Sequence, residues 1–217
     1  MNMKRLITKD GSVTYYNEVY DDIYHSMSGA LEEAKEKYTK PCRIGMLAKT
    51  GRVRVLDICF GLGYNACAAL DAALDADPDV KFELIGLESD PKILALTEGL
   101  DPEFENYGMI RSLARDLSFR QGGIDMKILL GDARKTICDV KGEFDALFLD
   151  PFAPKKQPEL WQAGFFSDIR GRMKRNAVLA TYSSASSVRK NLEKAGFRVK
   201  DGPKVGRATP STLAVNC

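Results

Sequence analysis

The sequence predicts an α/β fold in which helices cover both faces of a mostly parallel sheet. Strand-like and helical stretches alternate regularly from residue 53 onward. The strand-like stretches are continuous apolar runs, such as residues 146–149, which is typical of strands that are buried on both faces. A turn containing Gly61 and Gly63 follows the first of these strands. We therefore expect a doubly wound sheet with a ligand site at the carboxyl ends of its strands.

The chain is long enough to form one domain with a sizeable core. It has 217 residues, of which 44% are hydrophobic, and at this size one elaborated domain is more common than two. No run approaches the roughly 18 apolar residues that are needed to span a bilayer, and the N-terminus is too polar for a secretory signal. We therefore expect a cytoplasmic protein. Its five cysteines show no metal-ligand spacing, so we expect reduced thiols rather than a disulfide or a metal site.

The expected elements follow in order along the chain. Residues 7–15 are read as a hairpin that turns at Asp10-Gly11, and residues 29–38 as an amphipathic helix with Leu31, Ala34 and Tyr38 on one side. They belong to an N-terminal extension, predicted over 1–50, that packs on a core domain predicted over 51–217. Strands of the core are expected near 53–57, 82–88, 126–130, 144–149 and 177–182, and helices near 63–76, 91–98, 102–120, 132–139, 159–173 and 185–195. Two short terminal strands, at 197–200 and 212–215, should close the sheet, with an antiparallel strand at the C-terminal end.

An acidic residue ends or follows each of four consecutive predicted strands. These residues are Asp57, Glu88, Asp132 and Asp150. Because the carboxyl ends of parallel strands meet at one edge of a sheet, we expect the four carboxylates to line one site. Glu88 is placed to accept hydrogen bonds from two ribose hydroxyls, although it could also be a solvated loop acid. Asp132 is placed to accept from an adenine amine, although Asp is equally common as a helix N-cap.

The turn after the first strand suits a nucleotide-type cofactor. Gly61 and Gly63 allow bare backbone to approach a ligand, and the next helix presents free N–H groups at its start. Residues 61–66 also match the dinucleotide fingerprint, so the glycines alone do not name the cofactor. A nicotinamide enzyme has no need for an acid on each of four strands. S-adenosylmethionine fits better, since it presents an ammonium, a ribose, an adenine amine and a sulfonium.

The net charge of +2 conceals an uneven distribution along the chain. Residues 1–154 carry 19 Lys and Arg against 26 Asp and Glu, whereas residues 155–207 carry 13 against 4. Clustered charge of one sign is the electrostatic signature of a polyanionic partner, because neutralised phosphates release counterions. The charges could instead lie on a solvated surface without converging on one face. The residues expected to bind such a partner beside the Asp150 loop include Lys155, Lys156, Arg170 and Arg172.

At these strand ends the chain resembles the class I methyltransferases, which have a Rossmann-like fold and bind S-adenosylmethionine. One departure is Cys59, which stands where the first glycine of the usual turn is expected. The string from Asp150 through Pro151 to Phe152 resembles the Asp-Pro-Pro-aromatic element of methyltransferases that act on exocyclic or amine nitrogen. In that element the carboxylate holds the nitrogen and the ring packs on the acceptor, so the resemblance implies that Asp150 and Phe152 are catalytic. Prolines at 151, 154 and 158 should make this loop rigid.

The longer string over residues 148–161, FLDPFAPKKQPELW, closely resembles a signature of the MnmC-type tRNA methyltransferases. Residues 24–33, 180–185 and 188–197 also resemble segments of that family. Its members methylate the aminomethyl group on the wobble uridine of certain tRNAs. The resemblance therefore implies the same N-methylation, with a tRNA partner bound through its anticodon stem-loop. We expect a stand-alone methyltransferase without the flavin oxidase of the fused forms, and a monomer that needs no metal.

The predicted site follows from the strand ends and from this resemblance. The residues expected to hold the cofactor are Asp57, Phe60, Gly61, Gly63, Asn65, Glu88, Asp132, Ala133, Asp150, His25 and Glu33. The residues expected to bind the substrate are Lys155, Lys156, Trp161, Arg170 and Arg172. Asp150 would orient the acceptor amine, accept a hydrogen bond from it and help its proton leave. His25 would help the extension close over the methionine end of the cofactor, or would serve as the base instead.

Departures from the family leave the exact acceptor open. Pro151 replaces a glycine of the family string, and residues 202–211 differ from the form found in bacterial fused enzymes. Another tRNA nucleoside or a small-molecule amine is therefore an alternative acceptor. An aminopropyltransferase would share the fold but should show a Gly-Gly-Gly-Asp-Gly turn, which residues 57–63 do not. An RNA-binding module with a vestigial pocket is the non-enzymatic alternative, and the intact acids count against it.

Overall fold

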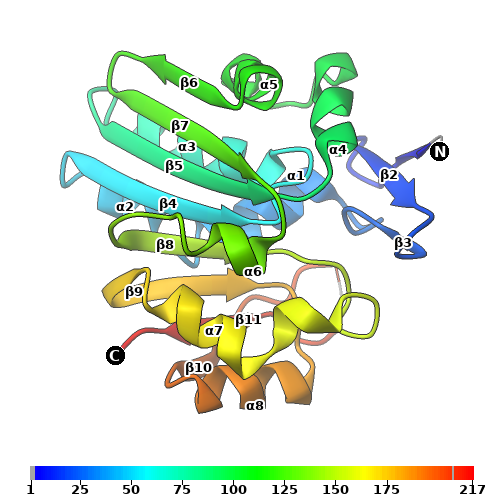
Figure 1. Cartoon of the computed structure of the whole chain (residues 1–217). Coiled ribbons are helices and arrows are strands. Elements are labelled where there is room, and N and C mark those ends of the chain that lie inside the picture. Colours follow the sequence, from blue (N-terminus) through cyan, green and yellow to red (C-terminus); the bar gives the residue numbers. More distant parts are fainter. Residues whose placement is uncertain (1–2, 207) are drawn as a thin grey trace.

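A central sheet with helices on both faces forms the body of the molecule (Figure 1). The computed structural model describes residues 3–206 and 208–217. In these residues the sheet has eight strands in the order β10-β11-β9-β8-β4-β5-β7-β6. The parallel strands are β4 (Arg52–Ile58), β5 (Lys81–Glu88), β7 (Ile124–Leu130), β8 (Phe144–Leu149) and β9 (Met173–Thr181). At the two sides, β6 (Ser118–Gln121) pairs antiparallel with β7, and β11 (Thr212–Val215) pairs antiparallel with β9 and with β10 (Arg198–Asp201).

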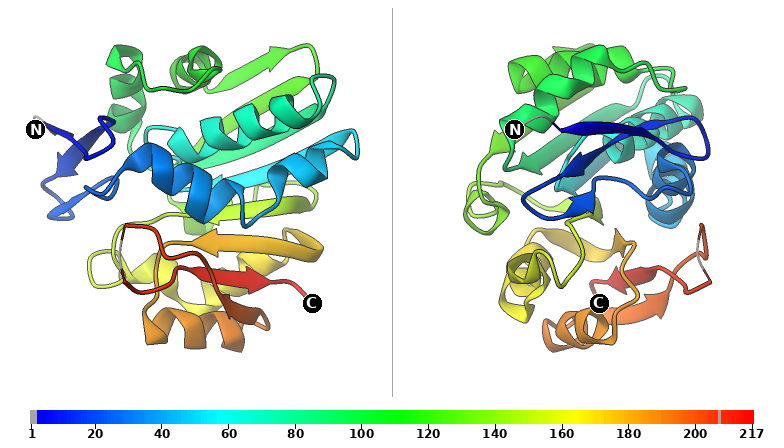
Figure 2. Two further views of the ribbon diagram at one scale, coloured as in Figure 1. Left: turned by 180° about the vertical axis from the view of Figure 1, so that it is seen from behind. Right: turned by 90° about the vertical axis from the view of Figure 1, so that its right-hand side faces the viewer.

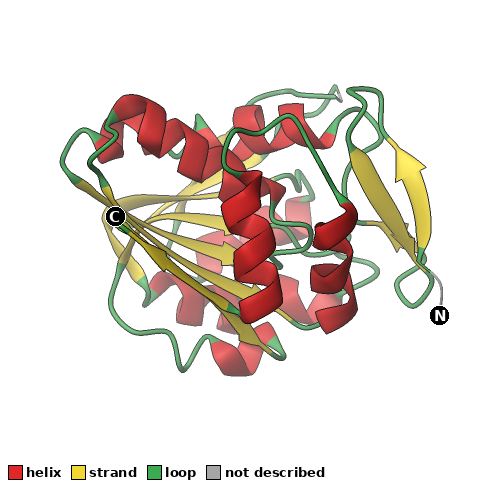
Figure 3. Cartoon of the chain, turned by 90° about the horizontal axis from the view of Figure 1, so that it is seen from above, coloured by secondary structure: helices red, strands yellow, loops and turns green. Residues whose placement is uncertain are grey.

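Two sets of helices cover the two faces of the sheet (Figures 2 and 3). The first set comprises α1 (Ala30–Glu33), the π-helix η1 (Ala34–Thr39), α2 (Ile44–Ala48), α3 (Tyr64–Ala76), α4 (Pro91–Leu96), the 3-10 turn η2 (Thr97–Gly99) and α5 (Tyr107–Asp116). The second set comprises α6 (Ala133–Thr136), the 3-10 turn η3 (Pro158–Trp161), α7 (Ala163–Arg170) and α8 (Ser186–Lys194). Within the described ranges, no helix is long and apolar enough to cross a membrane.

The two-sided cover explains why the strands are continuous apolar runs. Along β8, Ala146 and Phe148 pack into the core under α3, whereas Leu147 and Leu149 pack into the core under α7 and α8. Successive side chains of a strand point to opposite faces, so a strand with a helix layer on each face needs apolar residues at every position. The expectation of a mostly parallel α/β sheet with an antiparallel C-terminal strand is confirmed.

The N-terminal extension forms a small separate sheet. Strands β1 (Lys4–Ile7) and β2 (Val13–Asn17) make the expected hairpin, and β2 pairs in turn with β3 (Asp22–Ile23), a strand that the sequence analysis missed. This sheet stands beyond the carboxyl ends of β4 and β5 (Figure 1). Its residue Tyr15 belongs to the same core cluster as α1, η1 and α3. The division into domains at residue 50 stays a prediction.

Several predicted helices differ from the structure. The helix expected over 159–173 is divided between η3 and α7, and the helix expected over 132–139 spans only 133–136. The helix expected over 102–120 spans only 107–116, because Leu117 adopts a left-handed conformation with φ +58° and the chain then enters β6. The apolar spacing of Ile110, Leu113 and Leu117 continues past the true helix end, which explains the error. The helix expected over 29–38 exists, but its second part is the π-helix η1.

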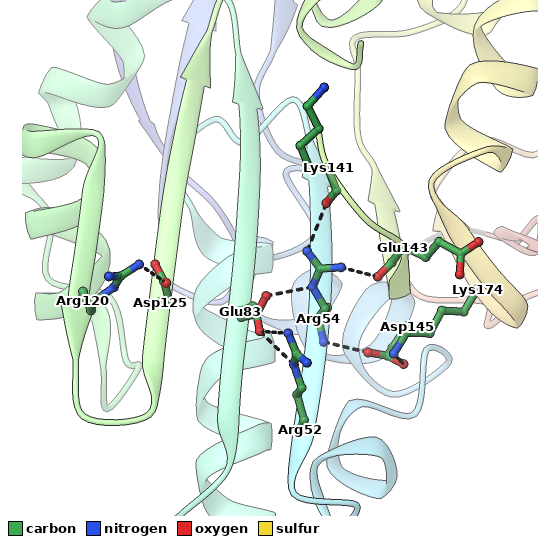
Figure 4. Close-up of polar contacts among 9 residues, drawn as sticks. All are labelled: Arg52, Arg54, Glu83, Arg120, Asp125, Lys141, Glu143, Asp145 and Lys174. Carbon is green, nitrogen blue, oxygen red and sulfur yellow. Dashed lines mark hydrogen bonds and ion pairs between the residues drawn. The ribbon is translucent and has the colours of Figure 1, made fainter. Parts of the chain in front are cut away.

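The amino edge of the sheet carries a network of ion pairs (Figure 4). The Nε of Arg54 lies 2.8 Å from Oε2 of Glu83, and the backbone N–H of Arg54 donates to Oδ2 of Asp145 at 2.9 Å. The second oxygen of Asp145 pairs with Nζ of Lys174 at 2.7 Å. Arg54 and Lys174 thus have carboxylate partners on neighbouring strands, and Asp57, Glu88 and Asp150 lie at the opposite edge of the sheet.

Candidate active site

A cavity of about 490 Å³ opens at the carboxyl ends of the parallel strands. Its walls come from the N-terminal extension, the turn after β4, the end of β5 and the loop after β8. A smaller cavity of about 230 Å³ lies under the end of β7, lined by Gly131, Asp132, Ala133 and Arg134 among others. Both cavities are lined by the following residues: Tyr20, Cys59, Glu88, Ser89 and Gln157. Because they share a wall, the two cavities form one elongated site.

The turn between β4 and α3 needs glycine for two separate reasons. Gly61 and Gly63 adopt positive φ angles of 57° and 75°, which cost other residues strain. A Cβ on Gly63 would also lie 2.5 Å from Ile110 and 2.8 Å from Phe60. The ring of Phe60 is 2% exposed and packs under this turn, so the structure places its side chain in the core rather than in the cavity. Cys59, at the position where the family has glycine, also has a positive φ of 68°.

Glu88 ties this turn to the end of β5. Its Oε2 accepts a hydrogen bond from the backbone N–H of Gly61 at 2.8 Å. Its Oε1 accepts from the N–H groups of Ser89 and Asp90 at 2.7 and 2.9 Å. Burial raises the pKa of Glu88, and the three backbone donors oppose that rise. An ionised carboxylate offers about four acceptor sites, so Glu88 can bind a further donor from the cavity.

Asp57 is the most isolated acid of the site. Its side chain is fully buried, and neither carboxylate oxygen has a hydrogen-bond partner among the described residues. Burial raises the pKa of Asp57 well above its usual range, and the charges of Asp150 and Glu88 add to the rise. An unpaired buried carboxylate is costly. Asp57 lies at the end of β4, just before the glycine turn, and its side chain lies behind the residues that line the two cavities. The missing partner fits a ligand that brings a positive charge or a hydrogen-bond donor.

Asp150 is held by two side chains from the other side of the sheet. The Tyr38 hydroxyl donates to Oδ1 at 2.6 Å, and Nδ2 of Asn65 donates to Oδ2 at 2.9 Å. Burial and the charge of Glu33 raise the pKa of Asp150 to about 7, against the effect of these two hydrogen bonds. Near neutral pH, Asp150 is therefore present in both its ionised and its protonated form. The amide of Asn65 thus orients Asp150, and its expected contact with the cofactor stays a prediction.

The loop after Asp150 is held by side chains that fix its backbone. The N–H of Phe152 donates to Oε1 of Gln157 at 3.2 Å, and its carbonyl accepts from Nε1 of Trp161 at 2.9 Å. The carbonyl of Pro151 accepts from the Tyr182 hydroxyl at 3.0 Å. Trp161 is only 2% exposed and packs in the core, and its expected contact with the substrate stays a prediction. Its role in the structure is to hold the Phe152 backbone.

Asp132 serves as an N-cap and as a wall of the smaller cavity at the same time. Its Oδ1 accepts from the N–H of Arg134 at 3.0 Å, which caps α6. The Arg134 guanidinium pairs with Oδ2 at 2.5 Å and lowers the pKa of Asp132. Ala133, the next residue, is buried at the same wall. The N-cap interpretation of Asp132 is therefore confirmed, and its contact with an adenine amine stays a prediction.

His25 and Glu33 line the larger cavity from the extension. Burial lowers the pKa of His25 to about 4, so the ring is neutral at pH 7. Its Nδ1 lies 3.4 Å from the Thr14 hydroxyl. Glu33 forms a buried ion pair with Lys37, and its Oε2 accepts from the N–H of Ser26 at 3.3 Å. His25 and Glu33 thus face the cavity from a fixed position.

The basic residues predicted to bind the substrate divide between two edges of the sheet. Lys155 and Lys156 are exposed on the loop that follows Asp150. Arg170 and Arg172 lie at the opposite edge, since the carbonyl of Arg172 accepts from the N–H of Phe144, the first residue of β8. Asp150 lies six residues after Phe144 along the direction of β8, a distance of roughly 20 Å. The expected single basic face beside the Asp150 loop is therefore wrong for Arg170 and Arg172.

Several residues at the site were not foreseen as functional. Tyr38 was interpreted as one residue of an apolar helix face, so its hydroxyl was not considered as a polar group of the site. Tyr20, Tyr24 and Gln157 also line the larger cavity. The signal that could have found Tyr20 and Tyr24 is the density of tyrosine in residues 15–24, where four of ten positions are Tyr.

The fold is that of the class I S-adenosylmethionine-dependent methyltransferases. A family model described as S-adenosyl-L-methionine-dependent methyltransferase matches residues 96–216. A crystal structure of MnmC2 from Aquifex aeolicus has 35% sequence identity and a TM-score of 0.86, and the match covers 100% of this chain and 70% of that one. The chain belongs to the MnmC-type family of S-adenosylmethionine-dependent methyltransferases. It is an enzyme whose cofactor is S-adenosylmethionine.

Two curated relatives extend this similarity. An uncharacterized protein of Methanocaldococcus jannaschii is 36% identical over 214 residues, which cover 95% of this chain and 58% of that protein. The tRNA 5-methylaminomethyl-2-thiouridine biosynthesis bifunctional protein MnmC of Ralstonia nicotianae is 31% identical over 219 residues, which cover 93% of this chain and 33% of that protein. The chain thus spans little more than half of the first relative and a third of the second.

Proposed function

We propose that the protein methylates the aminomethyl nitrogen on the wobble uridine of tRNA, through the anticodon stem-loop and in the cytoplasm. The observation that carries the proposal is the position of Asp150. Its carboxylate, oriented by Tyr38 and Asn65, lines the same cavity as Glu88 and the glycine turn. The printed names of the relatives MnmC2 and MnmC support a substrate related to 5-methylaminomethyl-2-thiouridine in tRNA.

The residues present fit S-adenosylmethionine. When bound, this cofactor supplies a methyl carbon activated by its sulfonium. The unpaired carboxylate of Asp57 suits the cofactor's ammonium, and Glu88 has acceptor capacity left for the ribose. The smaller cavity, with Asp132 and Ala133 in its wall, suits the adenine. Gly61 keeps the backbone free of a side chain where the cofactor would approach.

Asp150 has the properties of a group that receives an amine. An alkyl amine has a pKa of about 10.4, so at pH 7 its neutral form lies roughly 3.4 units uphill, about 4.6 kcal/mol. An ionised Asp150 orients the amine, accepts its hydrogen bond and helps the proton leave. The same charge also favours the ammonium form, and the nonpolar surroundings of Pro151 and Phe152 limit that opposing effect.

The rigid loop contributes orientation. Three prolines and the hydrogen bonds to Phe152 hold the segment that follows Asp150. A methyl transfer requires the nucleophile, the methyl carbon and the sulfur in line, and a fixed acceptor site lowers the entropic part of that barrier.

The test is a methyl-transfer assay on purified tRNA. The chain is incubated with S-adenosylmethionine and with tRNA that carries 5-aminomethyluridine or its 2-thio form at the wobble position. Mass spectrometry of the digested nucleosides should show one added methyl group on this nucleoside. Methylation of another nucleoside would redirect the proposal to that acceptor. Activity on free amines with none on tRNA would replace it with the small-molecule alternative.

Lys155 and Lys156 should supply phosphate contacts for the tRNA. We expect Lys155→Ala/Lys156→Ala to raise the KM for tRNA and to leave cofactor affinity unchanged, because phosphate contacts position RNA without reading its sequence. Each lost contact should flatten the slope of log affinity against log salt by about 0.7–0.9. The matched control is Arg170→Ala/Arg172→Ala, which removes the same charge at the opposite edge. Equal effects of the two double variants would contradict this docking face.

A further inference from the structure

The ring of Phe152 occupies a fixed place next to Asp150. Its backbone N–H and carbonyl are bonded to Gln157 and Trp161, and the residue lines the larger cavity with Asp150. The side chain is half-buried, so one part of the ring faces the cavity. A flat acceptor group lying on this ring would place a short substituent next to the Asp150 carboxylate.

A second aromatic ring already covers Phe152. Tyr20 stacks on it with ring centroids 4.6 Å apart and an interplanar angle of 25°. Tyr24 meets the same ring edge-on at 5.0 Å. Tyr20 lines both cavities, so it stands where the cofactor and acceptor parts of the site meet.

Tyr20 belongs to the turn between β2 and β3, whereas Phe152 belongs to the rigid loop. The turn is shaped internally by Oδ1 of Asn17, which accepts from the N–H groups of Val19 and Tyr20 at 2.9 and 3.2 Å. A polar contact that joins the turn to the loop is the ion pair between Asp21 and Lys156, at 2.6 Å. The Asp21 side chain is 71% exposed. Exposed ion pairs contribute little and weaken in salt, so this contact can open.

We propose that Tyr20 and Phe152 form the two walls of a stacking slot for the acceptor base. The turn carrying Tyr20 moves outward, the base enters between the two rings, and Tyr20 closes on its outer face. Single-stranded bases splayed out of RNA are recognised by stacking on aromatic side chains, and one such contact is worth about five- to a hundredfold in affinity. Lys156, released from Asp21, then becomes available to a phosphate of the same RNA. This inference rests on the proposed tRNA substrate.

The experiment compares Tyr20→Ala with Tyr20→Phe. The alanine variant should raise the KM for tRNA at least fivefold, whereas the affinity for S-adenosylmethionine, measured by calorimetry, should stay within twofold. Tyr20→Phe keeps the ring and should restore the KM to within twofold of the unmodified protein. Ile7→Ala, on the same extension but away from the cavity, is the control for general damage to the hairpin.

A cross-link on the unmodified protein gives an independent measurement. A tRNA anticodon stem-loop with 4-thiouridine at the wobble position should, on irradiation, attach to Tyr20 or Phe152. Attachment elsewhere, or a Tyr20→Ala variant with normal tRNA KM, would overturn the slot. So would a variant that loses cofactor affinity alone, since Tyr20 would then cover the cofactor. If the unmodified protein methylates no tRNA, the proposed function itself fails, and the two failures are distinct.

Discussion

The substitution Asp57→Asn removes the charge of this buried side chain and keeps its shape. The Asp57 carboxylate is fully buried, lacks a hydrogen-bond partner within the described ranges, and has a pKa raised by burial. Its ionisation therefore opposes folding of the ligand-free chain. The stability that the neutral form provides is fully present below the ordinary pKa of about 3.9 and is lost as pH rises through the folded-state pKa. Asp57→Asn cannot ionise, so its stability should not fall in this way as pH rises.

The expected size follows from the cost of ionising the buried carboxyl group. Each unit by which burial raises the pKa of Asp57 corresponds to about 1.4 kcal/mol of stability that is lost at alkaline pH. At the alkaline end of the range, ligand-free Asp57→Asn should thus exceed the unmodified chain in stability by about 1.4 kcal/mol or more, although its amide is also without a partner. For a chain of this size, each kcal/mol corresponds to about 2–4 °C in Tm. Cofactor binding should change in the opposite direction, because a hydrogen bond to a charged group is worth about 1.5–3 kcal/mol, or a tenfold to hundredfold loss of affinity.

Denaturation of ligand-free protein between pH 4 and pH 9, with calorimetry of cofactor binding, measures both effects. Asp145→Asn is a suitable control, since Asp145 is an acid of β8 with partners at both oxygens. It should lower stability and leave cofactor affinity intact. Unchanged cofactor affinity in Asp57→Asn, or a stability difference that does not vary with pH, would refute the role assigned to this carboxylate.

Three further outcomes are expected. Asp150→Asn should keep cofactor affinity within a few-fold and lose about 10²–10⁴ in kcat. The rate of the unmodified enzyme should fall below pH 7, where Asp150 becomes protonated, and the pH profile of the variant should lack this fall. Glu88→Ala should weaken cofactor binding about tenfold to a hundredfold by calorimetry and also lower Tm, because three backbone N–H groups lose their acceptor. Retained affinity would remove Glu88 from the site. The neutral His25 ring provides stability above pH 6.5, and this stability is lost as pH falls toward about 4. Over this range the free energy of unfolding of the unmodified chain should fall by roughly 3 kcal/mol more than that of His25→Gln. Identical acid denaturation curves would contradict this.

The central sheet could be predicted because each strand is marked by its own residues. Apolar runs such as Ala146–Leu149 carry the signal of two-sided burial within a few neighbouring positions. The errors occur where a distant contact or a backbone angle decides the structure. Leu117 ends α5 in a left-handed conformation without glycine, and the two-residue strand β3 exists only because β2 lies beside it.

The candidate site could also be predicted only in part. Glu88 and Asp150 could be placed at one edge of the sheet because strand order and direction follow from the α/β pattern. The partners of Asp150 could not, since Tyr38 is 112 positions away and its contact depends on how the extension packs. Trp161 belongs to the family-like string over residues 148–161, yet its side chain is buried, because some residues of that string hold the loop rigid rather than contact a ligand. Arg172 is close to the site in sequence but separated from it by the length of β8.

The π-helix η1 makes the site sensitive to the number of residues that precede it. The wider turn over Ala34–Thr39 accommodates more residues per turn than an α-helix does. Ahead of it, Leu31 is anchored by its N–H bond to Asp10, and behind it Cys42 is buried in the core. The wider turn already holds one residue more than an α-helical turn, so a single deletion can be absorbed by conversion to an α-helix, whereas one inserted residue would rotate Tyr38 by about 100° away from Asp150. Insertions in this helix are therefore changes by which evolution could disconnect the hydroxyl from the acid without replacing any residue of the site.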